Sequence, residues 1–306
     1  MCGMDINMIL EHTIDNNDAG KPVRIILKSR LQLSTKFINK LKLQNKIMIN
    51  NMPVKTNYIV SENEVLIAEL ELEEDCDNIE PQNIPIDIIY EDECLLVLNK
   101  QPGIVVHPTF NHPNSTIANG IVYYLKQKGI KKKVRPVSRL DRETSGIIIF
   151  AKNQFAQDIL IQQMQDKVFE KEYLGIVQGI PANNKGTINL PIDRKPESIM
   201  LRWISDSGAP SVTHYEVIES FSKYNAALLK FKLETGRTHQ IRVHCQAMGF
   251  PIYGDTLYSD YRDFLISRQA LHSHTTKILH PETKKEIIFN AELPQDIKSV
   301  LEIMGL

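Results

Sequence analysis

Residues 131–153, KKKVRPVSRLDRETSGIIIFAKN, place an acidic residue just before a stretch with the character of a buried strand. Gly146 to Phe150 is apolar and rich in β-branched residues, which is typical of a strand covered on both faces. Asp141 is therefore expected on the turn that leads into this strand, near its edge with solvent. Asn153 can cap a following helix, because its side chain accepts hydrogen bonds from free backbone N–H groups. The sequence thus predicts that two rigid elements hold the turn around Asp141.

Two arginines flank Asp141 in this turn. Arg139 precedes it by two positions, and Arg142 follows it directly. A neighbouring cation favours the ionised form of a carboxyl group, and an ionised aspartate can act as a nucleophile or a base. The same pattern also fits a structural ion pair on the surface, which is common and individually weak. The turn alone leaves both interpretations open.

A second polar segment lies far along the chain, where residues 233–259 are LETGRTHQIRVHCQAMGFPIYGDTLYS. Hydrogen-bond donors crowd around a turn at Thr235-Gly236, namely Arg237, His239, Gln240, Arg242 and His244. Ile241 and Val243 alternate with these polar residues, and such alternation is typical of a strand with one buried face. We therefore expect a strand here that presents polar side chains on its other face.

Together these two segments resemble the RluA/RluD-like family of pseudouridine synthases, whose hallmark is H-R-L-D-R-x-T-S-G followed by T-G-R-x-H-Q-I-R-x-H. The likeness runs from about Leu95 to the C-terminus and includes LVLNKQPGIVVHP, EKEYLGIVQG, GTINLPIDR, PIYGDTLYS and LHSHTTKILHPETKKEIIF. It implies an α+β catalytic fold with a mixed, largely antiparallel central sheet and flanking helices. One departure is Ser138, which stands where the family has a histidine and puts the fine positioning of the loop in question.

The resemblance also implies roles for individual residues. Asp141 is the carboxylate that attacks the target uridine, and Arg139 occupies the gap left by the flipped base. Tyr173, in the KEYLG segment, stacks on the base and is a candidate for handling the C5 proton. Arg237 pairs with Asp141, and Ile241 or a neighbour forms the apolar wall of the pocket. The other residues expected to bind substrate are Arg142, His239, Gln240 and Arg242.

No cofactor is expected for this chemistry. Uridine isomerisation breaks the N1–C1′ bond, turns the uracil and joins C5 to C1′, without a change of redox state or a donated group. The chain lacks the glycine-rich fingerprints of nucleotide-binding loops, and His272, His274 and His280 lack the spacing of zinc ligands, so we expect no metal. A glycoside hydrolase that uses Asp141 and Glu143 as a carboxylate pair is disfavoured by the single tryptophan in the chain.

The N-terminal part of the chain is divided by charge. Residues 21–60 contain nine lysines and arginines and no acidic residue, whereas residues 61–93 contain thirteen acidic residues and no lysine or arginine. The net charge of -1 conceals this division, because the chain without residues 61–93 has 36 basic and 24 acidic residues. A polyanion such as RNA is therefore an acceptable partner. A second basic run at 126–135 is placed to hold phosphates, although a solubilising loop has the same composition.

Residues 21–72 show the pattern of helices followed by a small hairpin. The predicted elements are a helix behind an N-cap at Ser34 or Thr35, a strand at 47–49, a turn at Asn50-Asn51, a returning strand at 54–60 and a closing segment at 65–67. The segment RLQLSTKFINKLKLQNKIMINNMPVKTNYIVSENEVLI resembles the alpha-L RNA-binding domain of ribosomal proteins and RNA-modifying enzymes. A basic packing module without RNA contact is the alternative interpretation.

The predicted organisation has four parts, namely a leader at 1–20, disordered or packed on the body, an alpha-L-like RNA-binding domain at 21–72, an acidic linker at 73–90 and a catalytic domain at 91–306. No apolar run approaches the roughly 18 residues of a membrane helix, and four dispersed cysteines fit a reducing cytoplasm. The sequence thus predicts a cytoplasmic, monomeric RNA-uridine isomerase acting on large-subunit ribosomal RNA. Transfer RNA as substrate, or a non-catalytic RNA-binding protein of the same fold, are the alternatives.

Overall fold

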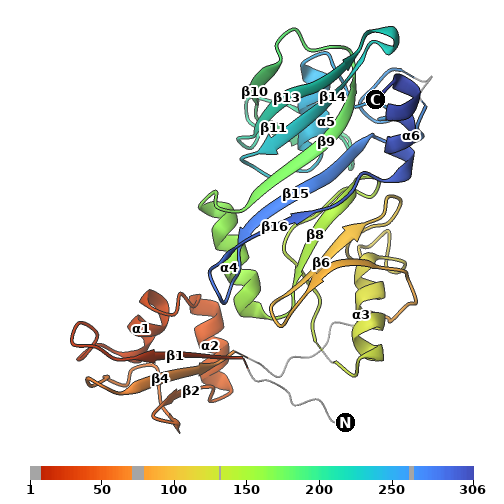
Figure 1. Cartoon of the computed structure of the whole chain (residues 1–306). Coiled ribbons are helices and arrows are strands. Elements are labelled where there is room, and N and C mark those ends of the chain that lie inside the picture. Colours follow the sequence, from red (N-terminus) through yellow and green to blue (C-terminus); the bar gives the residue numbers. More distant parts are fainter. Residues whose placement is uncertain (1–7, 71–78, 131, 262–264) are drawn as a thin grey trace.

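The computed structural model describes residues 8–70, 79–130, 132–261 and 265–306. Residues 1–7 of the predicted leader, residues 73–78 of the predicted linker and Lys131 of the second basic run lie outside these ranges. The chain forms a small N-terminal domain and a larger C-terminal domain (Figure 1). Within the described ranges, no helix combines the length and the apolar character needed to span a membrane.

The N-terminal domain packs two helices against a four-stranded sheet. Its elements are β1 (Ile9–Thr13), α1 (Val23–Ser29), α2 (Thr35–Leu43), β2 (Ile47–Ile49), β3 (Met52–Pro53) and β4 (Val65–Glu69). The strand order is β1-β4-β2-β3, and β1 lies antiparallel to β4. Part of the predicted leader is therefore a strand of this sheet, so the domain begins before residue 21.

The elements predicted for this domain form only in part. Ser34 is the N-cap of α2, because its hydroxyl accepts a hydrogen bond from the Phe37 backbone N–H at 3.1 Å. Asn50 and Asn51 both have positive φ, as the tight turn of a two-residue hairpin requires. The predicted strand at 54–60 is wrong. Carbonyl groups of this segment instead accept hydrogen bonds from the first backbone N–H groups of α1, which have no acceptor inside the helix.

The C-terminal domain is built on one long mixed sheet, to which ten strands of the described chain contribute. These strands are β5 (Asp87–Glu91), β6 (Leu95–Lys100), β7 (Arg135–Pro136), β8 (Ser145–Ala151), β9 (Glu170–Gln178), β10 (Lys185–Asn189), β13 (Val212–Phe221), β14 (Ala226–Leu233), β15 (Leu271–Leu279) and β16 (Glu286–Asn290). Their order is β10-β13-β14-β9-β15-β8-β6-β5, with β16 beside β15 and β7 beside β8. β15 and β8 pair in parallel and the other neighbours pair antiparallel, which confirms the predicted sheet.

Helices flank this sheet, as expected. They are α3 (Ile117–Gln127), α4 (Gln154–Gln165), α5 (Gln240–Ala247) and α6 (Gln295–Met304), and the smaller elements are β11 (Ile192–Arg194), β12 (Arg202–Ile204) and the 3-10 helix η1 (Ser222–Tyr224). Asn153 caps α4 by accepting a hydrogen bond from the Ala156 N–H at 2.8 Å. Figure 1 shows α4 between the N-terminal domain and the sheet, with α5 and α6 at the other end of the C-terminal domain.

β8 joins the two halves of the sheet. All of its residues are buried, with β6 antiparallel on one side and β15 parallel on the other. The contact with β15 depends on Gly146, which has a φ of +105°. A Cβ added to Gly146 would lie 2.2 Å from the carbonyl oxygen of Ser273. A side chain at this position would force the two strands apart. Gly146 therefore sets the spacing directly behind the Asp141 turn.

Gly146→Ala is expected to lower the free energy of unfolding by about 3 kcal/mol or more, because it combines the strain of a positive φ with a backbone clash. Gly129→Ala is the matched control, since Gly129 has a φ of +72° and no atom within 4 Å of an added Cβ, and it should cost about 1 kcal/mol. Urea unfolding followed by circular dichroism measures both losses. Equal losses would show that the β8–β15 contact tolerates a side chain.

Candidate active site

Asp141 lies on a turn just before β8, as the sequence predicts. The Asp141 carbonyl oxygen accepts a hydrogen bond from the Thr144 N–H at 3.1 Å, which closes the turn. The buried ammonium group of Lys100 donates to three backbone carbonyl oxygens, including that of Arg142 at 2.9 Å. Burial lowers the pKa of Lys100 to about 7, whereas its three carbonyl acceptors favour the protonated form. Lys100 thus ties the Asp141 turn to the loop after β6.

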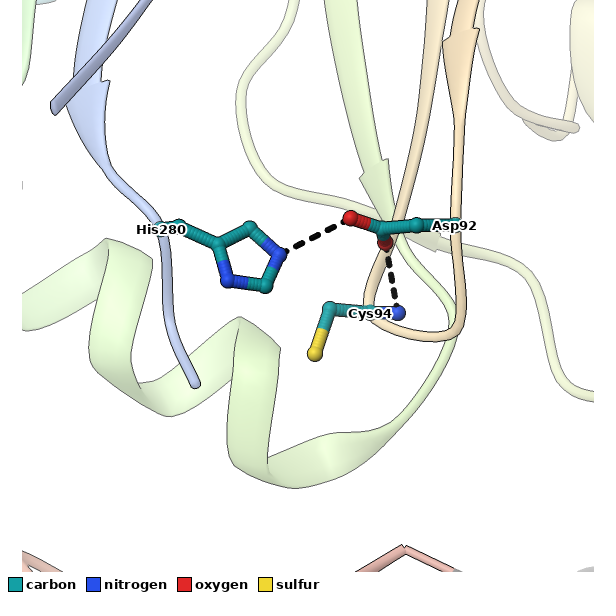
Figure 2. A group of neighbouring side chains, drawn as sticks. All are labelled: Asp92, Cys94 and His280. Carbon is teal, nitrogen blue, oxygen red and sulfur yellow. Dashed lines mark hydrogen bonds and ion pairs between the residues drawn. The ribbon is translucent and has the colours of Figure 1, made fainter. Parts of the chain in front are cut away.

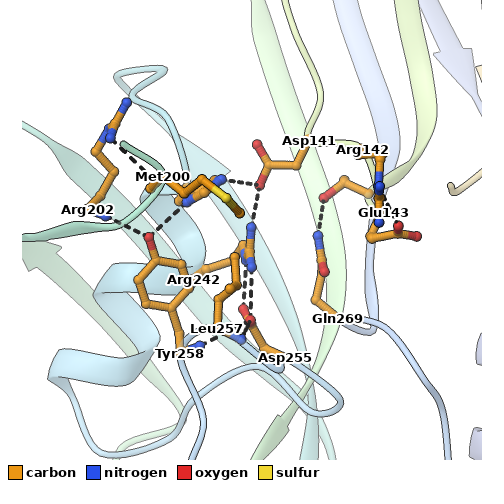
Figure 3. A network of polar contacts seen from close by, with 12 residues as sticks. Asp141, Arg142, Glu143, Met200, Arg202, Arg242, Asp255, Leu257, Tyr258 and Gln269 are labelled. Atoms are coloured by element: carbon orange, nitrogen blue, oxygen red, sulfur yellow. Dashed lines mark hydrogen bonds and ion pairs between the residues drawn. The ribbon is translucent and has the colours of Figure 1, made fainter. Parts of the chain in front are cut away.

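Arg242, on α5, is the cation that contacts Asp141 (Figure 3). Its Nη1 donates to Asp141 Oδ2 at 3.1 Å, while its Nε and Nη2 donate to the two carboxylate oxygens of Asp255 at 2.6 and 2.9 Å. The side chain of Arg242 is 5% exposed, that of Asp255 0% and that of Asp141 23%. The Tyr258 ring lies 5.0 Å from the guanidinium carbon. Asp255 therefore orients the guanidinium and leaves one of its edges for Asp141.

Two carboxylates share this one guanidinium. Burial alone would lower the pKa of Arg242, but the hydrogen bonds and charge of Asp255, together with the charge of Asp141, raise it above its ordinary value. Arg242 therefore remains protonated, and one positive charge faces two negative charges. Because Asp255 is buried and paired through both of its oxygens, the excess negative charge is presented by the partly exposed Asp141.

The pairing of Arg237 with Asp141 that the resemblance implied is wrong. Arg237 is exposed, and its Nε donates to the carbonyl oxygen of Pro210 at 3.3 Å. The strand expected around Ile241 and Val243 is also wrong, since these residues lie in helix α5. The helix turns the side chain of Arg242 toward Asp141, five positions after the arginine that the sequence favoured.

The burial of α5 explains why polar and apolar residues alternate along this segment although it is a helix. Every residue from Gln240 to Cys245 is buried. Ile241 and Cys245, one helical turn apart, pack in the same hydrophobic cluster as Tyr173, while Val243 belongs to a different cluster. Polar and apolar residues therefore alternate without marking an exposed and a buried face.

Gln240 was expected to bind substrate, and the structure places it in the scaffold. Its side-chain oxygen accepts hydrogen bonds from the Thr235 hydroxyl at 2.8 Å and the Arg237 backbone N–H at 3.0 Å. Its amide donates to the Val212 carbonyl and the Thr213 hydroxyl, both at 3.0 Å. These four contacts fix the start of α5 against β13.

His239 faces Asp141 from the position before α5. Its Nε2 lies 3.8 Å from Asp141 Oδ2, and its Nδ1 lies 2.8 Å from the Tyr258 hydroxyl, whose oxygen also accepts the Arg202 N–H. Burial, opposed by the charge of Asp141, lowers the pKa of His239. A neutral imidazole therefore stands beside Asp141, where it adds a polar group without adding a positive charge.

Tyr173, on β9, and Ile241, on α5, belong to one hydrophobic cluster, against which Leu140 also packs. Since Leu140 directly precedes Asp141, this cluster borders the Asp141 turn. Burial, with a smaller contribution from the charge of Asp141, raises the pKa of Tyr173 above its ordinary value. Its phenol is therefore protonated at neutral pH.

Among the described residues, neither arginine that flanks Asp141 in sequence forms an ion pair with it. Arg142 donates through Nε to Glu143 at 2.8 Å, and this pair lies to the side of Asp141, away from Arg242 (Figure 3). Arg139 is exposed. The cation that orients the carboxylate is thus supplied by α5 and not by the turn itself.

Asp92, Cys94 and His280 form a second polar cluster, whose residue types could bind a metal ion (Figure 2). His280 Nδ1 accepts the Thr283 N–H at 3.1 Å, so its Nε2 carries a proton and donates to Asp92 at 2.9 Å. The other oxygen of Asp92 accepts the N–H groups of Cys94 and Leu95. Burial raises the pKa of Cys94 to about 12, so its thiol stays protonated. These contacts engage both oxygens of Asp92 and both ring nitrogens of His280, and they account for the cluster as a clamp on the β5–β6 turn.

Asp255 and Tyr258 are site residues to which the sequence assigned no role. Both lie in the PIYGDTLYS block, where an aspartate and a tyrosine in a loop carry no signal of burial. Their function becomes visible only when the loop after α5 is seen to return beneath Arg242 (Figure 3).

The chain is similar to RNA-modifying enzymes in its fold and in its sequence. The solved structure of "Human RNA Pseudouridylate Synthase Domain Containing 4" superposes with a TM-score of 0.58 over 71% of this chain and 92% of that chain, at 23% identity. The sequence model of the RNA pseudouridylate synthase family matches residues 94–247.

Two relatives extend this match. "Uncharacterized RNA pseudouridine synthase YjbO" of Bacillus subtilis (strain 168) is 40% identical over 84% of this chain and 89% of its own length. "Ribosomal large subunit pseudouridine synthase D" of Buchnera aphidicola subsp. Schizaphis graminum is 37% identical over 72% of this chain and 74% of its own. The chain therefore belongs to the RNA pseudouridylate synthase family, and the predicted isomerase class is confirmed.

Arg242→Lys is expected to lower kcat by about tenfold or more, because an ammonium group lacks the planar fork that contacts Asp255 and Asp141 together. Arg237→Lys, the same substitution five positions earlier, should stay within about twofold of the wild-type rate. Tritium release from RNA labelled at uridine C5 measures both rates. A larger loss for Arg237→Lys than for Arg242→Lys would contradict the assignment of the cation.

Proposed function

We propose that this RNA pseudouridine synthase isomerises uridines of large-subunit ribosomal RNA and that Asp141 is its essential carboxylate. The observation that carries the proposal is a partly exposed aspartate held by a buried arginine, whose other hydrogen bonds go to Asp255. The ribosomal target is supported by the Buchnera relative, whose name states that substrate.

The reaction requires an ionised carboxylate beside the ribose of the target nucleotide. The N1–C1′ bond breaks, the uracil turns, C5 bonds to C1′, and the proton lost from C5 is balanced by one gained at N1. Arg242 orients Asp141 without cancelling its charge, because the same guanidinium also neutralises Asp255. Asp141 thus stays available to attack the nucleotide or to stabilise positive charge on the sugar.

Tyr173 would act as a neutral phenol. Its raised pKa means that it offers a ring face and a hydroxyl group, and that it is not a standing phenolate base. It packs with Ile241 in one hydrophobic cluster, which would form an apolar wall beside the Asp141 turn. Such a wall would hold the face of a uracil while the base turns.

A base in a folded RNA must leave its stack before Asp141 can reach it, at a cost of a few kcal/mol. Arg139, exposed and two positions before Asp141, is the residue we propose to fill the gap. Arg142 is also exposed and would contact nearby phosphates.

The N-terminal domain is proposed to be the RNA-binding module of alpha-L type. The absence of acidic residues from 21–60, against nine basic ones, supports this role.

We also propose that the enzyme works as a monomer in the cytoplasm. Ribosomal RNA is a cytoplasmic substrate.

Asp141→Asn is expected to lower kcat by more than about a thousandfold, because it removes the charge that we propose takes part in the reaction. The Kd for RNA should stay within a few-fold of wild type, because asparagine keeps the shape of the aspartate side chain. Glu143→Gln is the matched control, since it neutralises the other carboxylate of the same turn. It should retain most activity. Tritium release and filter binding provide the two measurements, and normal turnover by Asp141→Asn would refute the proposed role.

The RNA target can be mapped in cells that have or lack this gene. We expect carbodiimide primer extension to show that pseudouridine is lost from large-subunit ribosomal RNA in the deletion strain. Loss confined to transfer RNA would instead establish the alternative substrate. If every pseudouridine in both RNAs were still present in the deletion strain, the result would favour an RNA-binding protein without enzymatic activity.

A further inference from the structure

Arg268, three residues before the first residue of β15, holds the backbone of the Asp141 turn. Its Nη1 donates to the carbonyl oxygen of Glu143 at 2.9 Å. The next residue, Gln269, donates from its side-chain amide to the Thr144 hydroxyl at 3.4 Å, and Figure 3 shows this amide pointing toward the turn. Both side chains are buried. Two consecutive residues of the segment before β15 thus anchor the turn that precedes β8.

Asp296, in the first turn of α6, orients the guanidinium of Arg268. The Nε and Nη2 of Arg268 donate to the two carboxylate oxygens of Asp296 at 2.7 and 2.9 Å. A bidentate pair of this kind fixes the plane of the guanidinium as well as its position. Nη1 is thereby directed to the Glu143 carbonyl and, at 3.0 Å, to that of Gln269. One side chain therefore links α6 to the Asp141 turn.

This arrangement parallels the one around Arg242. Arg242 donates Nε and Nη2 to Asp255 and Nη1 to the carboxylate of Asp141. Arg268 donates Nε and Nη2 to Asp296 and Nη1 to a backbone carbonyl of the same turn. One buried arginine thus orients the carboxylate, and the other holds the backbone that carries it.

The backbone around Arg268 lies against the loop that carries Asp255. Gly254, directly before Asp255, has a φ of +78°, and a Cβ added there would lie 2.1 Å from the carbonyl oxygen of Arg268. The Ala270 N–H donates to the Tyr253 carbonyl at 2.8 Å. The segment before β15 and the loop after α5 are therefore in direct backbone contact.

Arg268 thus touches two parts of the site, the Asp141 turn through its side chain and the Asp255 loop through its backbone. Arg242 can contact both of these carboxylates only at one separation, because its donors form a rigid fork. If the turn moved about 1 Å away from Arg242, the 3.1 Å contact with Asp141 would no longer be a hydrogen bond. A misplacement of that size can cost about a hundredfold in rate.

We propose that Arg268 is a positioning residue of this enzyme, which fixes the Asp141 turn relative to the loop that carries Asp255. Asp296 acts through Arg268, because it holds the guanidinium in place. The inference rests on the proposed function, in which Asp141 is the essential carboxylate. It extends the support of the site to α6, which lies outside the residues 94–247 that the family model matches.

The test uses four variants of the full-length enzyme. Arg268→Lys keeps the charge but cannot contact both oxygens of Asp296 and the Glu143 carbonyl in the same geometry. Asp296→Asn keeps the size but places an NH2 group opposite a donor of Arg268. The third variant combines both substitutions. Glu292→Gln is the matched control, since it neutralises an 89% exposed carboxylate just before α6 that pairs with Lys298 at 2.9 Å.

Tritium release at saturating ribosomal RNA measures kcat, and filter binding measures Kd. Arg268→Lys is expected to lower kcat by about tenfold or more and Asp296→Asn by about three- to tenfold, with Kd within about twofold of wild type. The double variant should match Arg268→Lys within about twofold, because Asp296 acts only through Arg268. Glu292→Gln should keep the wild-type kcat.

A folded Arg268→Lys enzyme with wild-type kcat would overturn the inference, and so would a loss confined to Kd. Losses that multiply in the double variant would overturn the role of Asp296. Urea unfolding establishes which variants are folded under the assay conditions. If Arg268→Lys does not fold, Asp296→Asn decides the matter, because this aspartate is 40% exposed and wild-type kcat in its variant would overturn the inference.

Amide hydrogen exchange tests the placement of the turn without reference to activity. A peptide covering 137–147 contains the Thr144 N–H that closes the turn. Its exchange should become about fivefold faster or more in Arg268→Lys and Asp296→Asn, while a peptide from α4 keeps the wild-type rate. Equal acceleration of both peptides would overturn the inference. A wild-type enzyme that forms no pseudouridine would overturn the proposed function, and the exchange rates would still decide whether Arg268 fixes the turn.

Discussion

The site depends on one buried guanidinium that is shared by two carboxylates. Without Asp255 the charge on Arg242 would be destabilised in its environment, since a buried unpaired cation is strongly disfavoured. Asp255 in turn is fully buried and needs a cation. The pair therefore forms as a unit, and Nη1 of Arg242 fixes the direction of Asp141. This arrangement gives the partly exposed carboxylate a fixed orientation and leaves it a negative charge.

The scaffold brings three distant segments to this unit. The turn before β8 supplies Asp141, α5 supplies Arg242, and the loop after α5 supplies Asp255. Lys100 holds the first of these from the β6 side, and Gln240 holds the second against β13. The parallel contact between β8 and β15, which Gly146 permits, sets the spacing of the two halves of the sheet around them. Each polar anchor is buried and paired, so the geometry is set before RNA arrives.

Sequence patterns predicted an element correctly where neighbouring residues in the chain determine it. The apolar run at 146–150 is a buried strand, Ser34 and Asn153 cap their helices, and Asn50-Asn51 form a tight turn. The same reasoning was wrong at 54–60, whose carbonyl groups satisfy the start of α1. It was also wrong at α5, because a helix buried on nearly every side no longer displays its period in the pattern of polar and apolar residues.

The sequence by itself determined the family, the aspartate that we propose as the reacting group and the strand that presents it, because these follow from ordered motifs and from hydrophobic runs. Tertiary structure alone decided which arginine meets that aspartate. Arg237 and Arg242 have the same charge and similar neighbours in sequence, so composition cannot separate them. Only the helical rotation of α5 and the return of Asp255 beneath it direct one guanidinium inward, while the other remains in solvent. Direction in space is a property of packing between segments, and a short motif does not contain it.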